Sequence, residues 1–180
     1  MRQKNREVSN REELLEIMRR CDVCRLALNN EGYPYIVPMN FGLSVDEDKI
    51  SLIFHSALEG MKLDLIRKDN RASFEMDGKH QLQYFEEQGY CTMAYESVIG
   101  SGTIRFLSEK EKEQALRALM DQYHPGKMLN LIRQQSPERR FMFLKLRVLP
   151  EKGSCQSDTA ALQYEILVYS LDGSCRYGNK

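Results

Sequence analysis

The sequence predicts a mainly β protein, a small closed β-barrel of roughly six strands decorated with two or three helices. Three observations support this fold class. Apolar runs bounded by turn residues recur along the chain, which is typical of strands. Short turns separate the first strands, as in an antiparallel meander. Few segments have the spacing of an amphipathic helix.

Six segments have the apolar pattern of strands, at residues 22–28, 33–43, 50–56, 71–77, 94–107 and 140–149. The second segment contains Pro34 and Pro38. Because proline cannot donate to a ladder, we expect this strand at a sheet edge or with a bulge near Pro38. Gly100 and Gly102 predict a bend or a close backbone approach in the fifth segment.

Between residues 71 and 93 the pattern is less clear. We expect the strand at 71–77 to end in a turn at Asp77 and Gly78, and residues 78–92 favour neither helix nor strand.

Three segments have helical spacing of their apolar residues, at 9–20, 57–68 and 108–124. Ser9 or Asn10 is expected to cap the first helix, because short polar side chains accept hydrogen bonds from first-turn N–H groups. Ser108 and Glu111 have the spacing of a capping box at the start of the last helix.

Composition excludes several functions. The chain has 180 residues, with 26 Lys and Arg against 26 Asp and Glu, so its formal net charge is zero. Nucleic-acid binding needs a basic stripe, and steering to a charged membrane needs a net charge; neither is indicated. No apolar run approaches the roughly 20 residues that span a bilayer. The first residues have no apolar core of a secretory signal, and five irregularly spaced cysteines favour reduced thiols in the cytoplasm.

The length fits one domain at residues 1–150. The tail at 151–180 is rich in Gly, Ser and Cys, with one strand-like run at 162–169, "LQYEILVY". The tail matches no pattern with a known role, and we predict no function for it.

Residue spacing gives only weak support to two possible metal or redox sites. Cys21 and Cys24 form a C-x-x-C, but no second ligand pair follows, and the next residues predict a strand. We therefore expect these cysteines to be structural. The three histidines (His55, His80 and His124) and Cys91 have no compact ligand spacing, so no metal site is predicted.

The junction between the strand at 50–56 and the helix at 57–68 has an unusual feature. Ser56 and Glu59 have capping-box spacing, and the N–H groups at a helix start attract anions. At 100° per residue, Lys62 falls among the apolar positions of this helix. Its ammonium group either extends to solvent or binds a specific anion beside the helix start. The residues alone leave both readings open.

Three motifs carry a family resemblance, in the order "PYIVPMNFG", "IFHSALEGMKLDLIRKDNRASFEMD" and "YESVIGSGTIRFL". Together they resemble the flavin-binding split barrels related to pyridoxamine 5'-phosphate oxidase, and most of all the nitroimidazole-resistance branch. The resemblance covers residues 1–150. It implies a six-stranded antiparallel split barrel and a homodimer. It also implies FMN, with FAD as an alternative, bound between the two subunits.

The resemblance also implies site residues. The segment Val37, Pro38, Met39 and Asn40 would run along the flavin ring. His55 and Ser56 would contact the ribityl chain and phosphate, and Lys62 would bind the phosphate. A second subunit would close over the flavin with its segment Glu96, Ser97 and Val98.

The chain departs from the wider family at two points. Met61 stands where pyridoxamine phosphate oxidases commonly place a second basic phosphate ligand, which predicts weaker phosphate binding. The chain has no Trp, so the C-terminal substrate-binding Trp of those oxidases is missing, and the substrate-binding Arg has no counterpart either. Oxidation of vitamin B6 is therefore not expected.

The resulting hypothesis is an FMN-dependent oxidoreductase that reduces a small aromatic acceptor such as a 5-nitroimidazole. His55 is the candidate catalytic group, because an imidazole donates or accepts a proton near neutral pH. A non-catalytic flavin- or haem-binding split barrel is the alternative, since a fold does not fix a function. A domain that has lost its ligand is the third reading.

Overall fold

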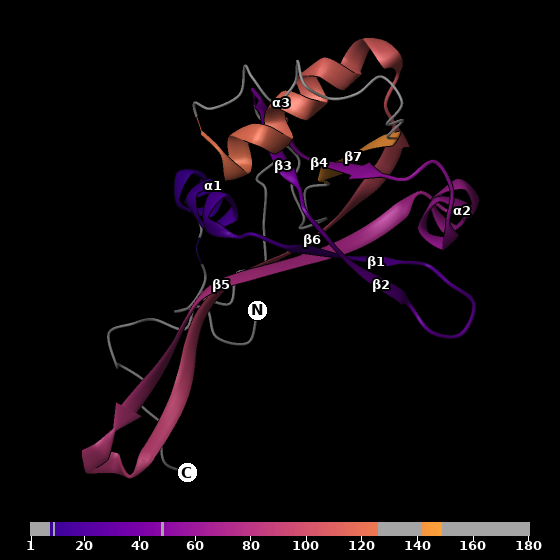
Figure 1. The fold of residues 1–180 in the computed structure, drawn as a ribbon. Helices are drawn as coiled ribbons and strands as arrows, with labels where there is room; N and C mark the ends of the chain where they lie inside the picture. Colours follow the sequence, from indigo (N-terminus) through magenta and orange to yellow (C-terminus); the bar gives the residue numbers. More distant parts are fainter. Residues whose placement is uncertain (1–7, 9, 48, 126–141, 149–180) are drawn as a thin grey trace, which may run out of the picture.

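The computed structural model describes residues 8, 10–47, 49–125 and 142–148. Over these residues it shows one seven-stranded antiparallel sheet with three α-helices around it (Figure 1). The strands are β1 (Cys24–Leu28), β2 (Tyr35–Met39), β3 (Gly42–Asp46), β4 (Lys49–Ser56), β5 (Arg71–Phe85), β6 (Tyr90–Phe106) and β7 (Met142–Val148). The helices are α1 (Arg11–Arg20), α2 (Met61–Lys68) and α3 (Lys112–Tyr123), with short 3-10 turns η2 (Glu86–Gln88) and η3 (Glu109–Glu111). The predicted mainly β class is confirmed.

The two edges of the sheet come from one stretch of chain. The strand order is β2-β1-β5-β6-β7-β4-β3, so β2 and β3 lie at opposite edges. Only Asn40 and Phe41 separate them. Three Cα steps span at most about 11 Å, so the sheet has to curl until its edges come close. Within the described residues no ladder joins β2 to β3, and full closure of the barrel remains a prediction.

This corner also explains the extra strand. The segment predicted as one strand at 33–43 is two strands, because the chain leaves one edge at Met39 and joins the other edge at Gly42. Pro38 lies in the edge strand β2, which pairs with β1 alone among the described strands. The expectation of an edge position for this proline is confirmed.

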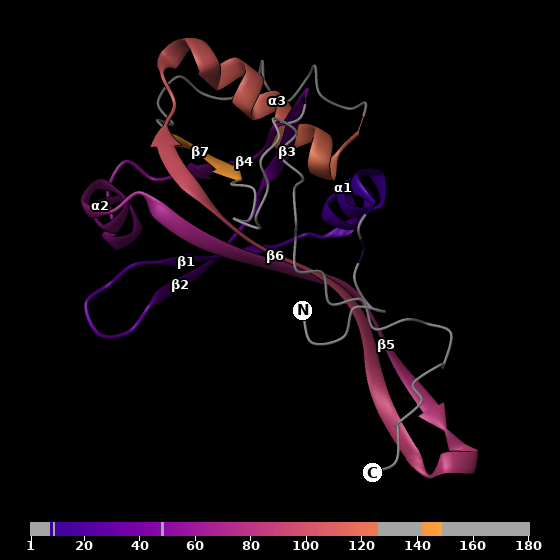
Figure 2. The ribbon, with the colours of Figure 1, turned by 180° about the vertical axis from the view of Figure 1, so that it is seen from behind.

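The predicted turn at Asp77 and Gly78 is wrong. β5 continues to Phe85 and pairs with β6 along its length, with a β-bulge between Gly78 and Gln81. Beyond this bulge the two strands extend away from the rest of the sheet as a hairpin, seen from both sides in Figures 1 and 2. We call residues 79–93 the arm. None of residues 79–93 is buried, so burial imposes no clear apolar period on this region, and the sequence left it undecided.

Close backbone contacts explain two glycines of β6. A Cβ at Gly102 would lie 2.3 Å from the carbonyl oxygen of Arg147 on β7, and one at Gly100 would lie 2.6 Å from the ring of Phe74. The predicted close approach at these positions is confirmed.

The helix ends follow the predicted capping chemistry in two of three cases. Asn10 caps α1, its side-chain oxygen accepting from the N–H groups of Glu12 and Glu13. Ser108 and Glu111 form the expected capping box, although the first turn is the 3-10 turn η3 rather than α-helix. Within the described part of the chain, no helix is long and apolar enough to cross a membrane.

The end of α3 fixes the corner between β2 and β3. The Tyr123 hydroxyl accepts from the Phe41 N–H at 3.0 Å and donates to the Asp22 carbonyl at 2.8 Å. The neighbouring Gln122 amide donates to carbonyl oxygens at the end of α1, including that of Cys21. Because Phe41 is fully buried, these bonds hold the corner against the core.

Replacing Tyr123 by Phe tests this attachment. The change leaves the Phe41 N–H and the Asp22 carbonyl without their partner. Tyr123→Phe should lower the free energy of unfolding by about 1–3 kcal/mol. Urea denaturation of the purified chain measures this value. The control Tyr33→Phe removes a hydroxyl from a side chain that is 86% exposed and should change stability by less than about 0.5 kcal/mol. Equal effects of the two variants would contradict the assigned role.

Candidate functional site

The candidate site lies where β4 leads into α2. The helix begins at Met61, four residues later than predicted, and Gly60 is its N-cap. The predicted capping box of Ser56 and Glu59 is therefore wrong. Gly60 has φ of 128°, a conformation that glycine adopts easily and that a helix does not continue through. The structure thus ends the strand at Ser56 and starts the helix after a short bend.

The start of α2 has no side-chain cap. Gly60 offers only its carbonyl oxygen, which accepts from the N–H groups of Leu63 and Asp64 at 2.9 and 3.3 Å. The N–H groups of Met61 and Lys62 have no acceptor among the described residues, and the positive end of the helix dipole lies beside them. Such a helix start favours an anion.

Lys62 lies in the first turn, on the inner side of the helix. The buried residues of α2 are Leu63, Leu65 and Ile66. At 100° per residue, Lys62 falls between Leu65 and Ile66 around the helix axis, and it is half-buried. Met61, the apolar first residue of the helix, is 50% exposed. The delayed helix start thus leaves Lys62 within the buried arc.

The basic residues of α2 differ in their partners. Arg67 pairs with Asp64 at 2.9 Å, and Lys68 pairs with Glu31 at 3.4 Å. Among the described residues, no carboxylate forms an ion pair with Lys62. A half-buried ammonium group next to a helix N-terminus puts two positive features side by side, which is unfavourable unless an anion binds there.

His55 lies close enough to Lys62 to feel its charge. The pKa of His55 is lowered from 6.5, first by desolvation of its ring and then by the positive charge of Lys62. Because both causes disfavour the imidazolium, His55 is neutral at pH 7. An anion bound between the two side chains would favour the protonated form again.

Ser56 has an unsatisfied hydroxyl. The residue is 4% exposed, and its Oγ has no hydrogen-bond partner among the described residues. It follows the alternation of the buried β4 residues Leu52 and Phe54, so its side chain lies on the core face and that of His55 on the opposite face. Buried hydroxyls almost always have a partner, so this position fits a group that accepts or donates a hydrogen bond.

The segment from Val37 to Asn40 forms the end of β2 and the corner after it. Val37 and Met39 pack against the core, and Pro38 and Asn40 are exposed. Since β2 pairs with β1 alone among the described strands, the backbone groups on its other side are open to a ligand.

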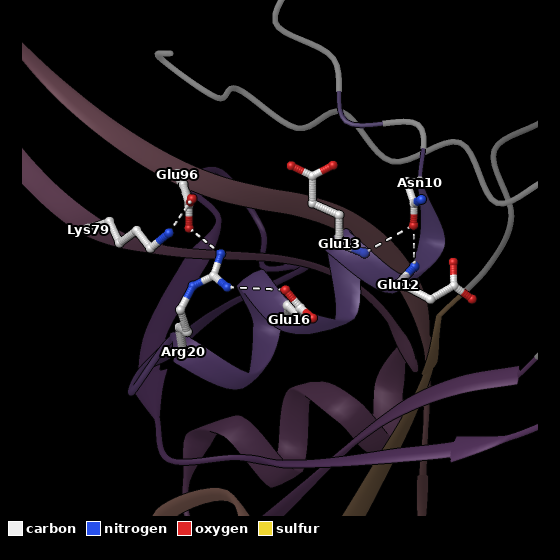
Figure 3. A network of polar contacts seen from close by, with 7 residues as sticks. All are labelled: Asn10, Glu12, Glu13, Glu16, Arg20, Lys79 and Glu96. Atoms are coloured by element: carbon white, nitrogen blue, oxygen red, sulfur yellow. Dashed lines mark hydrogen bonds and ion pairs between the residues drawn. The ribbon is translucent and has the colours of Figure 1, made fainter. Parts of the chain in front are cut away.

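The segment from Glu96 to Val98 is held within its own subunit. Val98 is fully buried and Ser97 is 3% exposed. The Glu96 carboxylate accepts from Arg20 of α1 at 2.7 Å and from Lys79 at 2.9 Å (Figure 3). Burial raises the pKa of Glu96, but the hydrogen bonds from Arg20 and Lys79 outweigh burial and lower it overall. Sequence reasoning missed both basic partners, because no sequence spacing links α1 to β6.

The C-x-x-C cysteines are structural, as expected. Cys21 and Cys24 are buried and carry no disulfide. Burial, assisted by Asp77 and Glu75, raises the pKa of Cys21 to about 12, and burial likewise raises the pKa of Cys24. Neither thiol forms the reactive thiolate that redox chemistry needs. In the described ranges, no three His, Cys, Asp or Glu side chains gather as a metal site.

Comparison with known proteins identifies the family of this fold. The family profile described as pyridoxamine 5'-phosphate oxidase matches residues 10–156. The chain therefore belongs to the pyridoxamine 5'-phosphate oxidase-like family. No curated protein matches the chain at a significant level.

Solved structures share the fold at low sequence identity. One is a candidate 5-nitroimidazole antibiotic resistance protein from Bacteroides thetaiotaomicron, with a TM-score of 0.60 and 24% identity over 79% of this chain and 87% of that one. A FAD and heme binding protein from Mycobacterium smegmatis has a TM-score of 0.69 and 17% identity over 91% of this chain and 73% of that one. A FAD-binding protein from Mesorhizobium loti has a TM-score of 0.51 and 20% identity, covering 78% and 90%.

The link between Lys62 and His55 can be measured directly. Replacing Lys62 by Met removes one of the two causes that lower the pKa of His55, so this pKa should rise toward 6.5 without reaching it. NMR titration of the imidazole protons gives the value. Because folding lowers the pKa of His55, the free energy of unfolding decreases as the pH falls through this pKa. The decrease should be smaller in Lys62→Met.

Lys68→Met is the matched control, because Lys68 lies at the other end of α2. This variant should leave the His55 titration unchanged. An unchanged His55 pKa in Lys62→Met would show that the two groups do not interact.

Proposed function

We propose that the chain binds FMN, with its phosphate at the start of α2, and acts as a flavin-dependent oxidoreductase. The observation that carries the proposal is the half-buried Lys62, which has no carboxylate partner in the described residues and lies in the first turn of an uncapped helix. Membership of the pyridoxamine 5'-phosphate oxidase-like family supports it.

The residues at the junction fit a phosphate ester. Lys62 would give a charge-assisted hydrogen bond, and the first-turn N–H groups of α2 would bind further oxygens. The unsatisfied hydroxyl of Ser56 would gain a partner on the phosphate or the ribityl chain. Met61 supplies no second basic ligand at this helix start, so phosphate affinity rests mainly on Lys62. FAD, which also carries phosphate, is the alternative cofactor.

The open edge of β2 would take the flavin ring. The exposed backbone groups from Val37 to Asn40 would bond the polar edge of the ring, and Pro38 withholds an N–H at one position. Flavin supplies transfer of a hydride or of single electrons. The backbone from Val37 to Asn40 would orient the ring, and the neutral His55 would be able to hold a proton at this site.

A small aromatic acceptor fits this arrangement, and we propose a 5-nitroimidazole as the example. The fold shared with a candidate 5-nitroimidazole resistance protein supports this choice at the level of the fold. The second subunit of a homodimer would cover the flavin with its segment from Glu96 to Val98. The side chains of Ser97 and Val98 are buried in their own subunit, so the backbone of this segment would make the contact.

A non-catalytic flavin- or haem-binding protein is the second candidate. The observation in its favour is His55, whose neutral imidazole at the edge of the site has the chemistry of an axial haem ligand. The structural neighbour from Mycobacterium smegmatis is described as binding both FAD and heme. The flavin reading is favoured because the uncapped start of α2 suits a phosphate, whereas Lys62 taken alone would also suit a haem propionate.

Titration of FMN and riboflavin against the wild type and Lys62→Met tests the phosphate site. Losing a charge-assisted hydrogen bond costs about 1.5–3 kcal/mol, so FMN should bind roughly ten- to hundredfold more weakly to the variant. Riboflavin has no phosphate, and its affinity should stay the same. Lys68→Met serves as the control for the loss of a charge from α2. Equal FMN affinities of wild type and Lys62→Met would remove Lys62 from the site.

Turnover tests the catalytic part of the proposal. FMN-loaded protein supplied with NADH or NADPH should reduce a 5-nitroimidazole or a quinone, which absorbance measures directly. His55→Gln should lower the rate and flatten its pH dependence, because the amide does not exchange a proton near neutral pH. Flavin binding without electron transfer to any nitroaromatic or quinone would leave the non-catalytic reading.

A further inference from the structure

A cavity lies between α3 and the strands β3, β4 and β7. The helix packs across β3 and β4 (Figures 1 and 2). A Cβ at Gly42 would collide with the backbone of Ala118, so the helix lies directly on β3 at this point. On the side of η3 and β7 the helix leaves a cavity of about 300 Å³ that is open to solvent.

One wall of this cavity is apolar. It consists of Ile53 from β4, Leu107, and the alanines Ala115 and Ala118 of α3. Ile53 and Ala115 are buried together with Phe143 in a small core cluster. The two alanines are three residues apart, so they lie on the same side of the helix. Because their methyl groups are short, the space between helix and sheet stays open.

Three polar side chains line the cavity beside this wall, namely Ser44 of β3, Gln114 of α3 and Lys145 of β7. Lys145 and Ser44 are half-buried. Within the described part of the chain, none of the three side chains takes part in a hydrogen bond or an ion pair. All three carry hydrogen-bond donors, so the cavity offers donors to a ligand that accepts.

The acidic residue of the cavity has its own partners. The Glu111 carboxylate accepts from both terminal nitrogens of Arg105, at 2.5 and 3.1 Å, and from the Ser108 N–H at 3.0 Å. Lys145 is opposite Ile53 on one side and Arg105 on the other, so these side chains share one face of the sheet. Two cations and one carboxylate therefore leave this face with one unpaired positive charge, on Lys145.

We propose that this cavity binds a small organic carboxylate with an apolar body, a short aliphatic or monocyclic aromatic acid. The ligand carboxylate would accept a charge-assisted hydrogen bond from Lys145 and further hydrogen bonds from Ser44 and Gln114. Its apolar body would lie against Ile53 and the two alanines. An apolar wall with a few convergent polar groups is typical of small-molecule sites. One ammonium group among neutral donors suits a monoanion.

The cavity shares no residue with the proposed flavin site. Ile53 precedes His55 by two residues on the same face of β4, and Phe143 lies opposite His55 in the ladder. Phe143 is buried in the cluster that forms the apolar wall. The inference therefore does not depend on the proposed function, and the two can be tested separately.

Titration of the full chain with benzoate, followed by the backbone amide signals in NMR at constant ionic strength, tests the proposal. Benzoate should shift the amides of Ser44, Ile53 and Ala115 in a saturable way. Benzyl alcohol has the same ring without the charge, and it should bind roughly tenfold more weakly or less.

Variants separate the charge from the space. Gln114→Glu places a carboxylate beside Lys145 with little change of size at an exposed position, and it should weaken benzoate binding roughly tenfold or more, as should Lys145→Met. Ala118→Leu fills the cavity and should abolish binding of both probes. Lys68→Met, which removes a positive charge at the end of α2, is the control and should leave the benzoate affinity unchanged. Amide signals away from the cavity show that each variant is folded.

Three results would overturn the proposal. One is the absence of saturable shifts with benzoate, and another is equal benzoate affinity of the wild type and Gln114→Glu. The third is benzoate binding that FMN displaces and Lys62→Met weakens, which would place the anion at the start of α2. A chain that binds benzoate in the cavity but retains no FMN would refute the proposed function and leave this inference standing.

Discussion

The corner at Asn40 and Phe41 is the constraint on which the rest of the structure depends. It takes the chain from one edge of the sheet to the other within two residues, so the sheet has to curl. The Tyr123 hydroxyl, shared between the Phe41 N–H and the Asp22 carbonyl, ties this corner to the ends of α1 and α3. β2 ends at the same corner, and the open edge of β2 is the proposed binding position of the flavin ring. Fold and candidate site therefore share one attachment point.

The candidate site contains one lysine, Lys62, at the start of a helix in a chain whose formal net charge is zero. Elsewhere on α2 the basic side chains have acidic partners, and the acids at the base of the arm are likewise paired with basic residues. Lys62 departs from this rule among the described residues, and it does so at an uncapped helix start beside His55 and the unsatisfied Ser56 hydroxyl. A phosphate ligand accounts for the whole arrangement.

Sequence reasoning predicted the features that depend on local chemistry. The Asn10 cap, the capping box at Ser108 and the edge position of Pro38 follow from the hydrogen bonds that these side chains make or withhold. Sequence reasoning failed for the features that depend on long-range strand pairing or on the backbone conformation of a single residue. The bulge after Gly78 depends on the register with β6, and the start of α2 depends on the φ angle of Gly60. The position of Lys62 among apolar residues follows from helical spacing, which is local in the sequence. Its proximity to His55 depends on the fold.

Flavin binding at the junction of β4 and α2 can be tested by the absorption spectrum of the purified full chain, taken after incubation with excess FMN and removal of the unbound flavin. We predict the two visible bands of oxidised flavin, shifted from those of free FMN by the apolar surroundings, with FMN and chain in equimolar amounts. A Soret band in the protein as purified would show that the site holds haem. The absence of retained flavin after incubation would show that the positive junction between β4 and α2 does not bind a flavin phosphate.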